Sequence, residues 1–319
     1  MFQGNADNAW FVLVGPTAVG KSAVAEILAQ SFETDILIAD SRQVYKDLEI
    51  GTGKPDAAAR KKLKRHLIDF VSPEEIFSAG AYKRKAEILI AQMLAAGNKI
   101  LIEGGTGLYL KALLYGLWDG PPADWAYREH LMEREKAEGA GTLHRDLSIL
   151  DPPSAAKTHK RDVPRIVRAL EVRHLTGRAI SEIHSEDAAM RLKQTTPHSL
   201  IGLRRDRAYL YQRIEERVDA YMASGLLEEV ERLLAAGLSE DFPAMRGLGY
   251  RQLIPHLKGL QSLDEAVSIL KRDTRRFAKR QMTWFRADKN IHWLDIKMNE
   301  KASETADRIM RLKKEDSVL

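Results

Sequence analysis

Short apolar runs alternate with amphipathic stretches along the first third of the chain. Residues 10–14 (WFVLV), 34–40 (TDILIAD) and 99–107 (KILIEGGTG) contain apolar runs of strand length that end in glycine or polar residues. Residues 23–32 and 81–99 carry apolar side chains at helical spacing. Parallel strands need long crossovers, which are usually helices, so this alternation predicts an α/β fold with a doubly wound parallel sheet.

The character of the sequence changes after the third predicted strand and its following helix. Residues 124–190 are charged and helical and contain no run that resembles a strand. Residues 201–205 (IGLRR) then resemble a strand that returns to the sheet, and long helices follow before a short strand at 292–295. The expected segments are 1–117, the first part of the core; 118–195, a helical insertion domain; and 196–319, which completes the core and adds C-terminal helices.

The composition is that of a globular protein without thiol chemistry. Hydrophobic residues make up 44% of the 319 residues and charged residues 30%, and the net charge is +5. The chain has no cysteine, which excludes disulfides, a thiol nucleophile and cysteine-ligated zinc. The N-terminal residues lack the pattern of a signal peptide, and no stretch has the length of a membrane span. We therefore expect a cytoplasmic protein without membrane contact.

The sequence GPTAVGKS at 15–22 follows the G-x-x-x-x-G-K-[ST] pattern of phosphate-binding loops. A predicted strand precedes it and a predicted helix follows, which favours this loop over a glycine turn that binds nothing. Backbone amides would surround linked phosphates, the Lys21 ammonium would neutralise their charge, and the Ser22 hydroxyl would bind magnesium. The predicted phosphate-binding residues are Gly15, Pro16, Thr17, Ala18, Val19, Gly20, Lys21 and Ser22.

Two other predicted strands end in carboxylates. Asp40 closes the second strand, and Glu103 closes the third, just before a glycine loop at 104–107. Ligands of doubly wound folds bind at the carboxyl ends of strands, so Asp40 and the glycine loop should face the phosphate loop. The pattern leaves Asp40 open between a magnesium-shell ligand or helix cap and a general base, and the glycine loop open between a tight turn and a binding loop. The sequence GTGKP at 51–55 predicts a turn with a candidate phosphate-side lysine.

A basic helix is predicted near the C-terminus. Residues 271–286 contain seven cations and one acid, a net +6. At about 100° per residue, six of the cations lie within roughly 140° of one another, and Phe277, Trp284 and Phe285 lie opposite. A solvated face normally mixes both signs of charge, so we expect this face to contact a nucleic-acid backbone. The cations are Lys271, Arg272, Arg275, Arg276, Lys279, Arg280 and Arg286.

Other basic features are weaker. Arg213 and Arg217 are four residues apart on a predicted helix, an unfavourable pairing unless an anion joins them or neighbouring acids screen them. Residues 159–170 add further arginines, and the turn at 246–251 (RGLGYR) places Tyr250 between two arginines, where it could stack on a base. Together with the phosphate loop, these features predict two anionic substrates, one small and one a polynucleotide.

Seven stretches of the sequence resemble, in order, those of the tRNA dimethylallyltransferases, also called tRNA isopentenyltransferases. They are GPTAVGKS, ADSRQVYKDLEIGTGKP, EGGTGLYLKALLYG, PRIVRALEV, RRDRAYLYQRIEERVDAYMASGLLEEV, MRGLGYRQL and KRQMTWFR, between residues 10 and 295. The resemblance implies a P-loop NTPase-like fold and transfer of a dimethylallyl group from dimethylallyl diphosphate to the exocyclic amine of the adenosine 3′ of the anticodon. The phosphate loop would then hold the diphosphate of the prenyl donor.

The resemblance also implies a role for each matching residue. Asp40 would be the general base, Ser22 would bind magnesium and the diphosphate, and Lys21 and Arg217 would hold the leaving group. Ser22 stands where many members have threonine, which keeps the hydroxyl. The residues that match tRNA-contacting positions are Asp40, Ser41, Arg42, Gln43, Thr106, Arg128, Pro164, Arg165, Ile166, Val167, Arg168, Arg246, Gly247, Leu248, Gly249, Tyr250, Arg251, Lys279, Arg280, Gln281, Met282, Thr283, Trp284, Phe285 and Arg286.

The implied partners are the anticodon arm of tRNA and dimethylallyl diphosphate, with magnesium as the cofactor and the insertion as a clamp on the tRNA. The chain resembles the bacterial form, because eukaryotic relatives often add a cysteine-bearing zinc finger. No long hydrophobic seam indicates an oligomer, so we expect a monomer. A small-molecule kinase would share the phosphate loop but leave the basic helix unexplained, and a non-catalytic RNA-binding ATPase would leave Asp40 without a role.

Overall fold

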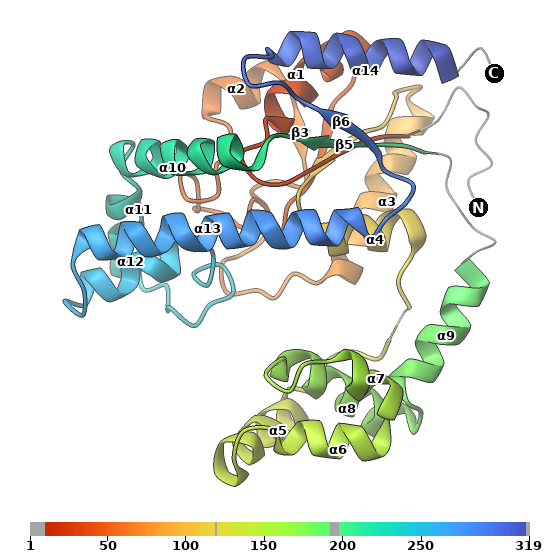
Figure 1. The fold of residues 1–319 in the computed structure, drawn as a ribbon, viewed down its shortest axis with the longest axis vertical. Helices are drawn as coiled ribbons and strands as arrows, with labels where there is room; N and C mark the ends of the chain where they lie inside the picture. The colour runs from red at the N-terminus through yellow and green to blue at the C-terminus, as the bar shows by residue number, and fades with distance from the viewer. Residues whose placement is uncertain (1–9, 119, 192–197, 317–319) are drawn as a thin grey trace. The chain divides into compact units, whose positions relative to one another are not determined.

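A computed structural model describes residues 10–118, 120–191 and 198–316 of the chain (Figure 1). The described residues up to Leu114 and those from 198 onward form one compact unit, which we call the core unit. The residues that follow Leu114, up to 191, form a second compact unit, which we call the helical unit. Each unit has its own apolar core.

The core unit is built on a six-stranded sheet with the strand order β3-β2-β4-β1-β5-β6. Every pair of neighbouring strands in it is parallel, which confirms the predicted doubly wound parallel sheet. The strands are β1 (Trp10–Val14), β2 (Ile36–Ala39), β3 (Arg65–His66), β4 (Leu101–Gly104), β5 (His198–Arg204) and β6 (His292–Asp295).

Helices cover both sides of this sheet, with α1 and α14 on one side in Figure 1 and α4 and α13 on the other. Apolar side chains of the strands explain this, because Phe11 and Leu13 of β1 pack with Leu28 of α1 and Ile309 of α14 in one buried cluster. The helices are α1 (Lys21–Phe32), α2 (Ala57–Lys62), α3 (Ala79–Ala95), α4 (Gly107–Tyr115), α10 (Arg207–Ala223), α11 (Leu226–Ala235), α12 (Tyr250–Leu257), α13 (Leu263–Arg286) and α14 (Ala302–Asp316).

The central strands end together at one edge of the sheet. Gly104 of β4 is in register with Val14 of β1 on one side and with Ala39 of β2 on the other. A Cβ on Gly104 would overlap the backbone of Ala39, so this close approach requires glycine. The three loops that leave these strands, which begin at Gly15, Asp40 and Gly105, are therefore neighbours.

The helical unit is an all-helical bundle among its described residues. Leu131, Leu143, Leu147, Ile166 and Leu170 form most of its buried core. Aspartates begin two of the helices, because carboxylates before α5 and α7 accept hydrogen bonds from backbone amides of the first turn. The helices are α5 (Trp125–Glu138), α6 (Thr142–Leu150), α7 (Pro152–Lys157), α8 (Val163–Thr176) and α9 (Ile180–Arg191).

Four elements of the core unit had no counterpart in the sequence patterns, namely β3, α2, α12 and α14. Strand β3 has only two residues, and α2 (AAARKK) has no periodic apolar face, so neither produces a recognisable signal. Strand β5 begins at His198, three residues before the predicted start, because its first two residues are only half-buried. Among the described residues, no helix is both long and apolar enough to cross a membrane.

Candidate active site

The phosphate loop joins β1 to α1 and leaves the first turn of α1 available to an anion. Gly15 and Gly20 have positive φ angles of 149° and 111°, and a Cβ on Gly15 would lie 2.6 Å from the Leu203 carbonyl oxygen. No side chain caps the N-terminus of α1. Its first backbone amides can therefore donate to a phosphate group, and the helix dipole favours the negative charge.

Two arginines hold this loop from outside. The Arg205 Nε donates to the Val19 carbonyl at 3.0 Å, and the Arg213 Nε donates to the Ala18 carbonyl at 3.0 Å. These bonds fix the carbonyls on one side of the loop, and Ala18 adopts a left-handed conformation with φ 63°. Arg205 was absent from the sequence predictions, because an arginine just after a strand carries no signal of what it contacts.

Lys21 and Ser22 begin α1 and meet the buried Glu103. The Lys21 Nζ donates to the Pro16 carbonyl at 2.9 Å, and the Ser22 hydroxyl donates to Glu103 Oε1 at 2.6 Å. Burial lowers the pKa of Lys21 to about 8, against the influence of the Glu103 and Asp40 carboxylates. Burial likewise raises the pKa of Glu103, against the influence of Lys21 and the Ser22 hydrogen bond. Desolvation therefore dominates both groups.

A surface depression of about 440 Å³ opens over this loop. Its lining contains three cations, Lys21, Arg213 and Arg217, and one acid, Glu216. Gly20, Ser22 and Gly53 complete the floor. Cations, helix N-terminal amides and a hydroxyl around one depression are the groups that bind linked phosphates.

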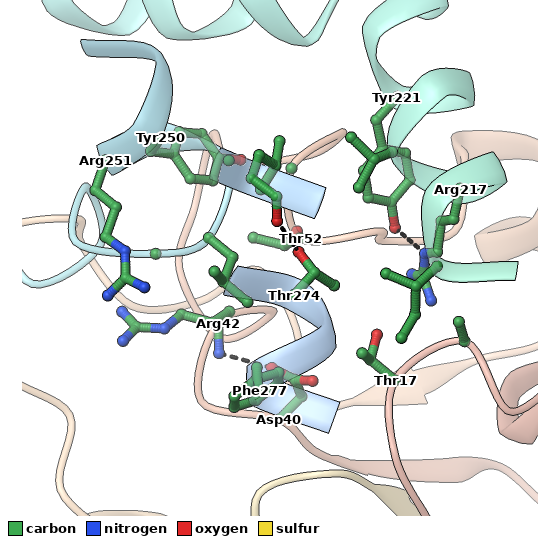
Figure 2. Close-up of a pocket in the computed structure, with 18 of the residues that line it drawn as sticks. Thr17, Asp40, Arg42, Thr52, Arg217, Tyr221, Tyr250, Arg251, Thr274 and Phe277 are labelled. Atoms are coloured by element: carbon green, nitrogen blue, oxygen red, sulfur yellow. Dashed lines mark hydrogen bonds between the residues drawn. The ribbon is translucent and has the colours of Figure 1, made fainter. Parts of the chain in front are cut away.

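A cavity of about 290 Å³ adjoins this depression and shares Ala18 and Arg217 with it (Figure 2). Asp40 lies at one side of the cavity, and Arg217 and Tyr221 of α10 lie at another (Figure 2). Much of the wall is apolar, and most of its aliphatic and aromatic side chains come from α10, α11 and α13. They include Ile214, Val218, Leu226, Leu270 and Phe277.

Asp40 acts as a cap with one of its oxygens. Its Oδ1 accepts hydrogen bonds from the backbone amides of Arg42 at 2.8 Å and Gln43 at 3.3 Å. Within the described part of the chain, the second oxygen has no assigned hydrogen bond, and the half-buried side chain lines the cavity. The Thr106 hydroxyl accepts from the Ser41 amide at 2.9 Å, so the glycine loop and the Asp40 turn lie side by side, as predicted from the strand ends.

The comparisons with known proteins agree on one family. Residues 43–288, well over half of the chain, match the model of the family described as IPP transferase. The chain belongs to the IPP transferase family. A tRNA dimethylallyltransferase 2 from Syntrophus aciditrophicus is 45% identical over 94% of this chain and 96% of the relative. A tRNA dimethylallyltransferase from Acetivibrio thermocellus is 43% identical over 89% of this chain and 90% of the relative.

Solved structures show the same fold. The tRNA isopentenylpyrophosphate transferase of Bacillus halodurans has a TM-score of 0.69 and 34% identity, over 97% of this chain and 98% of that one. A eukaryotic dimethylallyltransferase, whose structures are described as snapshots of the enzyme acting on tRNA, has a TM-score of 0.75 and 26% identity, over 90% of this chain and 74% of that one. The doubly wound sheet is therefore shared by this IPP transferase and its solved relatives.

Three residues of the core unit that were expected to contact tRNA have buried side chains. The Tyr250 ring is fully buried and its hydroxyl donates to Glu229 Oε1 at 2.6 Å, so the expected stacking on a base is wrong for this conformation. Gln281 accepts from the Thr17 amide and donates to the Gly105 carbonyl, both at 2.9 Å, and so ties the phosphate loop to the glycine loop. Phe285 packs in the interior. Burial removes the Gln281 and Phe285 side chains from an RNA surface, and Tyr250 only borders the cavity.

The basic face of α13 differs from its prediction in two ways. Trp284 is 38% exposed and lines a surface hollow with Arg276, Lys279 and Arg280, so its expected place opposite the cations is wrong. The reason is the helical spacing, because i and i+4 residues share a face.

Part of the positive charge on α13 is also neutralised by ion pairs. Lys271 pairs with Asp219, Arg275 pairs with Glu215, and Arg272 and Arg276 pair with Asp273. In the part of the chain that the structure describes, Lys279, Arg280 and Arg286 have no ion-pair partner.

In the helical unit, two of the expected tRNA contacts share a buried acid. Arg128 makes two hydrogen bonds to Glu171, at 2.7 and 2.8 Å, and Arg168 makes one at 2.5 Å. Ile166 and Val167 lie in the core of the unit, which excludes their side chains from a surface contact. Arg165 is exposed and, among the residues that the structure describes, forms only a long ion pair of 3.5 Å with Asp162.

Lys54, the candidate phosphate-side lysine, is bound by other residues of the protein. Its side chain is fully buried, and its Nζ donates to the Tyr45 carbonyl at 2.5 Å and to Asp69 Oδ1 at 2.7 Å. The prediction of a phosphate contact is therefore wrong, because the ammonium is fully buried and a third oxygen, Glu49 Oε1 at 3.4 Å, accepts its remaining hydrogen. Glu229, which organises the same loop, was missed, since one of three glutamates on an amphipathic helix gives no indication of burial.

Proposed function

We propose that this chain transfers a dimethylallyl group from dimethylallyl diphosphate to the exocyclic amine of the adenosine next to the anticodon of tRNA, on its 3′ side. The C–O bond of the donor breaks, a C–N bond forms, diphosphate leaves, and the amine loses one proton. Membership in the IPP transferase family and the names of the relatives support this reaction. The single observation that carries it is a pair of adjoining hollows, which share Ala18 and Arg217 and together present the phosphate loop, an apolar wall and the Asp40 carboxylate.

The donor diphosphate occupies the basic depression in this proposal. The amides of the first turn of α1 donate to its oxygens, and Lys21, Arg213 and Arg217 neutralise the charge that grows as the C–O bond breaks. The dimethylallyl chain then extends into the adjoining cavity, because Arg217 and Ala18 lie at the junction of the two spaces. The apolar wall covers the dimethylallyl group and keeps water from its allylic carbon.

Asp40 takes the proton from the adenine amine. Two backbone amides fix one carboxylate oxygen, which leaves the other to face the cavity. The neutral amine is a weak nucleophile, so removal of its proton during attack favours the transfer. Because an adenosine stacked in the anticodon loop cannot enter such a cavity, the nucleotide has to rotate out of the stack.

The oxygen donors at the phosphate loop fit magnesium. Ser22 Oγ and Glu103 Oε1 lie 2.6 Å apart. The Asp40 carboxylate is also close to this group, because its charge and that of Glu103 both act to raise the pKa of Lys21. Magnesium usually binds one or two protein oxygens together with substrate phosphates, so no complete protein cage is required. When bound, the ion would supply positive charge for the leaving diphosphate.

The exposed cations at the cleft entrance bind the RNA backbone in this proposal. Arg246, Arg251 and Arg280 line the cavity, and Lys279 and Arg286 continue the basic face of α13. These side chains contribute a salt-dependent affinity that does not depend on sequence. The helical unit, with the exposed Arg165, would clamp the anticodon arm.

A single assay tests the proposal. The protein is incubated with unmodified tRNA and either dimethylallyl diphosphate or ATP, and the nucleosides are analysed by mass spectrometry. We expect an adenosine that carries one added dimethylallyl group in the first mixture only. Robust ATP turnover without any prenylated adenosine would instead support a kinase or an RNA-binding ATPase.

A further inference from the structure

The loop at 49–54 (EIGTGK) enters the cleft although it contains no catalytic side chain. Gly51 and Thr52 line the cavity, and Gly53 forms part of the floor of the basic depression. The loop is a closed turn, because the Gly53 amide donates to the Ile50 carbonyl at 2.9 Å and the Lys54 amide donates to the Glu49 carbonyl at 3.2 Å. Buried charged groups hold both of its ends.

Glu229 of α11 anchors the first half of the loop. Its carboxylate accepts hydrogen bonds from the backbone amides of Glu49 at 3.2 Å, Ile50 at 2.8 Å and Gly51 at 3.3 Å. The Tyr250 hydroxyl donates a fourth bond at 2.6 Å. Glu229 is only 4% exposed, so these four donors replace the water that a carboxylate would otherwise bind. The cost of burying this charge is offset only while the loop keeps this path.

Lys54 anchors the second half. Its buried ammonium binds the Tyr45 carbonyl and Asp69, and it lies 3.4 Å from Glu49 Oε1. Arg60 closes the group, with contacts of 3.2 Å to Asp69 and 2.5 Å to Glu49. The two cations and two anions form one network, which joins Glu49 at the start of the turn to Lys54 at its end. The loop is therefore fixed at both ends before any substrate binds.

What this rigid loop presents to the cleft is the bare backbone of Gly53. A Cβ at this position would overlap the Arg217 Nη2 and the Tyr221 hydroxyl. Arg217 is also held by Tyr221, since its Nε donates to the Tyr221 hydroxyl and its Cζ lies 5.1 Å from the Tyr221 ring centre. The guanidinium and the Tyr221 hydroxyl thus both lie against the Gly53 backbone. The same turn orients Gln43, whose Nε2 lies 3.3 Å from the Thr52 carbonyl oxygen.

We propose that the 49–54 loop is a positioning element for Arg217: Glu229 and Lys54 hold Gly53 against the guanidinium, and the absence of a side chain at position 53 sets where that cation meets the diphosphate. This inference rests on the proposed function, because Arg217 is assigned to the diphosphate there. The Arg217 side chain has enough rotatable bonds to place its guanidinium at many positions. The loop removes this freedom in advance, which is the form of preorganisation that favours a charged transition state.

A matched pair of glycine variants tests the inference. Gly53 has φ 65° and Gly97 has φ 78°, but nothing lies within 4 Å of a Cβ on Gly97. Gly53→Ala and Gly97→Ala therefore share the backbone strain, and only the first displaces Arg217 and the Tyr221 hydroxyl that binds it. We expect Gly53→Ala to weaken the binding of inorganic diphosphate and to lower kcat/KM for dimethylallyl diphosphate by about 10- to 100-fold, the scale of a misplaced catalytic group. Gly97→Ala should leave diphosphate binding and kcat/KM unchanged, and the affinity for tRNA should be the same in the two variants.

A double-mutant cycle with Arg217→Ala identifies the route of the effect. If Gly53 acts through Arg217, Gly53→Ala causes no further loss of diphosphate affinity once Arg217 is alanine. Additive losses, or a Gly53→Ala variant that binds diphosphate as Gly97→Ala does, would overturn the inference. Glu229→Gln tests the anchor, and a folded variant with normal diphosphate affinity would exclude it. Diphosphate binding is measured without the transfer reaction, so failure of the proposed function appears separately, as a wild-type protein that forms no prenylated adenosine.

Discussion

Replacing Asp40 by asparagine separates the two roles that the structure places on one carboxylate. Asparagine keeps an oxygen that can accept from the Arg42 and Gln43 amides, so the turn after β2 keeps its shape. It cannot take a proton from the adenine amine. General-base catalysis contributes about 10²- to 10⁴-fold, which corresponds to about 3 to 5 kcal/mol of activation free energy. We expect Asp40→Asn to lower the single-turnover rate of dimethylallyl transfer by this factor, with little change in tRNA affinity.

Asp40→Ala is the control for the capping role. Alanine loses the base and both backbone contacts, so this variant should also lose about 0.5 to 2 kcal/mol of folding free energy, as helix-cap replacements do. Asp40→Asn should lose much less in the same urea titration. The reasoning fails if Asp40→Asn transfers the prenyl group at more than about a tenth of the wild-type rate. The loss in rate would then be smaller than the removal of a general base causes. It also fails if tRNA binding collapses, because Asp40 would then be a recognition residue.

Three further predictions follow from the charges and contacts of the cleft. Because burial lowers the pKa of Lys21 to about 8, affinity for inorganic diphosphate should fall as the pH rises through that value and the ammonium loses its proton; calorimetry that finds the same affinity on either side would contradict this. Replacing Lys279, Arg280 and Arg286 together by alanine should weaken tRNA binding and reduce the slope of log affinity against log salt by about 2. A wild-type slope in filter binding would place the RNA elsewhere. Gln281→Leu leaves the half-buried Thr17 amide and the buried Gly105 carbonyl without partners, so chemical denaturation should show a loss of about 2 to 4 kcal/mol. A loss near zero would mean that the two loops are held by other contacts.

The elements that the sequence predicted well are those with strong local signals. The apolar runs before Gly15 and Asp40 are central strands, because only residues buried on both faces form such unbroken runs. The phosphate loop was recognisable because its glycines, lysine and serine are constrained by local geometry. Asp40 could be placed at the cleft for the same kind of reason, since the carboxyl ends of parallel strands share one edge of the sheet.

The predictions that failed depended on contacts between distant residues. Tyr250 lies in a glycine turn typical of an exposed loop, yet Glu229 from another helix binds its hydroxyl and buries it. Lys54 follows a glycine turn beside a phosphate site, yet Asp69 and the Tyr45 carbonyl hold its ammonium. The cations of α13 formed a single-sign face in the helical projection, yet acids of α10 neutralise part of it.

By itself, the sequence determined the parallel α/β core, the phosphate loop and the position of Asp40 at a strand end, because hydrophobic periodicity and loop chemistry are local properties. It also determined the family, through motifs in a characteristic order. Only the tertiary structure decided which charged side chains remain available to a substrate and which are held by partners far away in the chain. The reason is physical: the free energy of a buried charge depends on every donor and acceptor around it, and folding alone brings those groups together. Gly53 shows this most clearly, because its role arises from Arg217, a residue that the fold places against it.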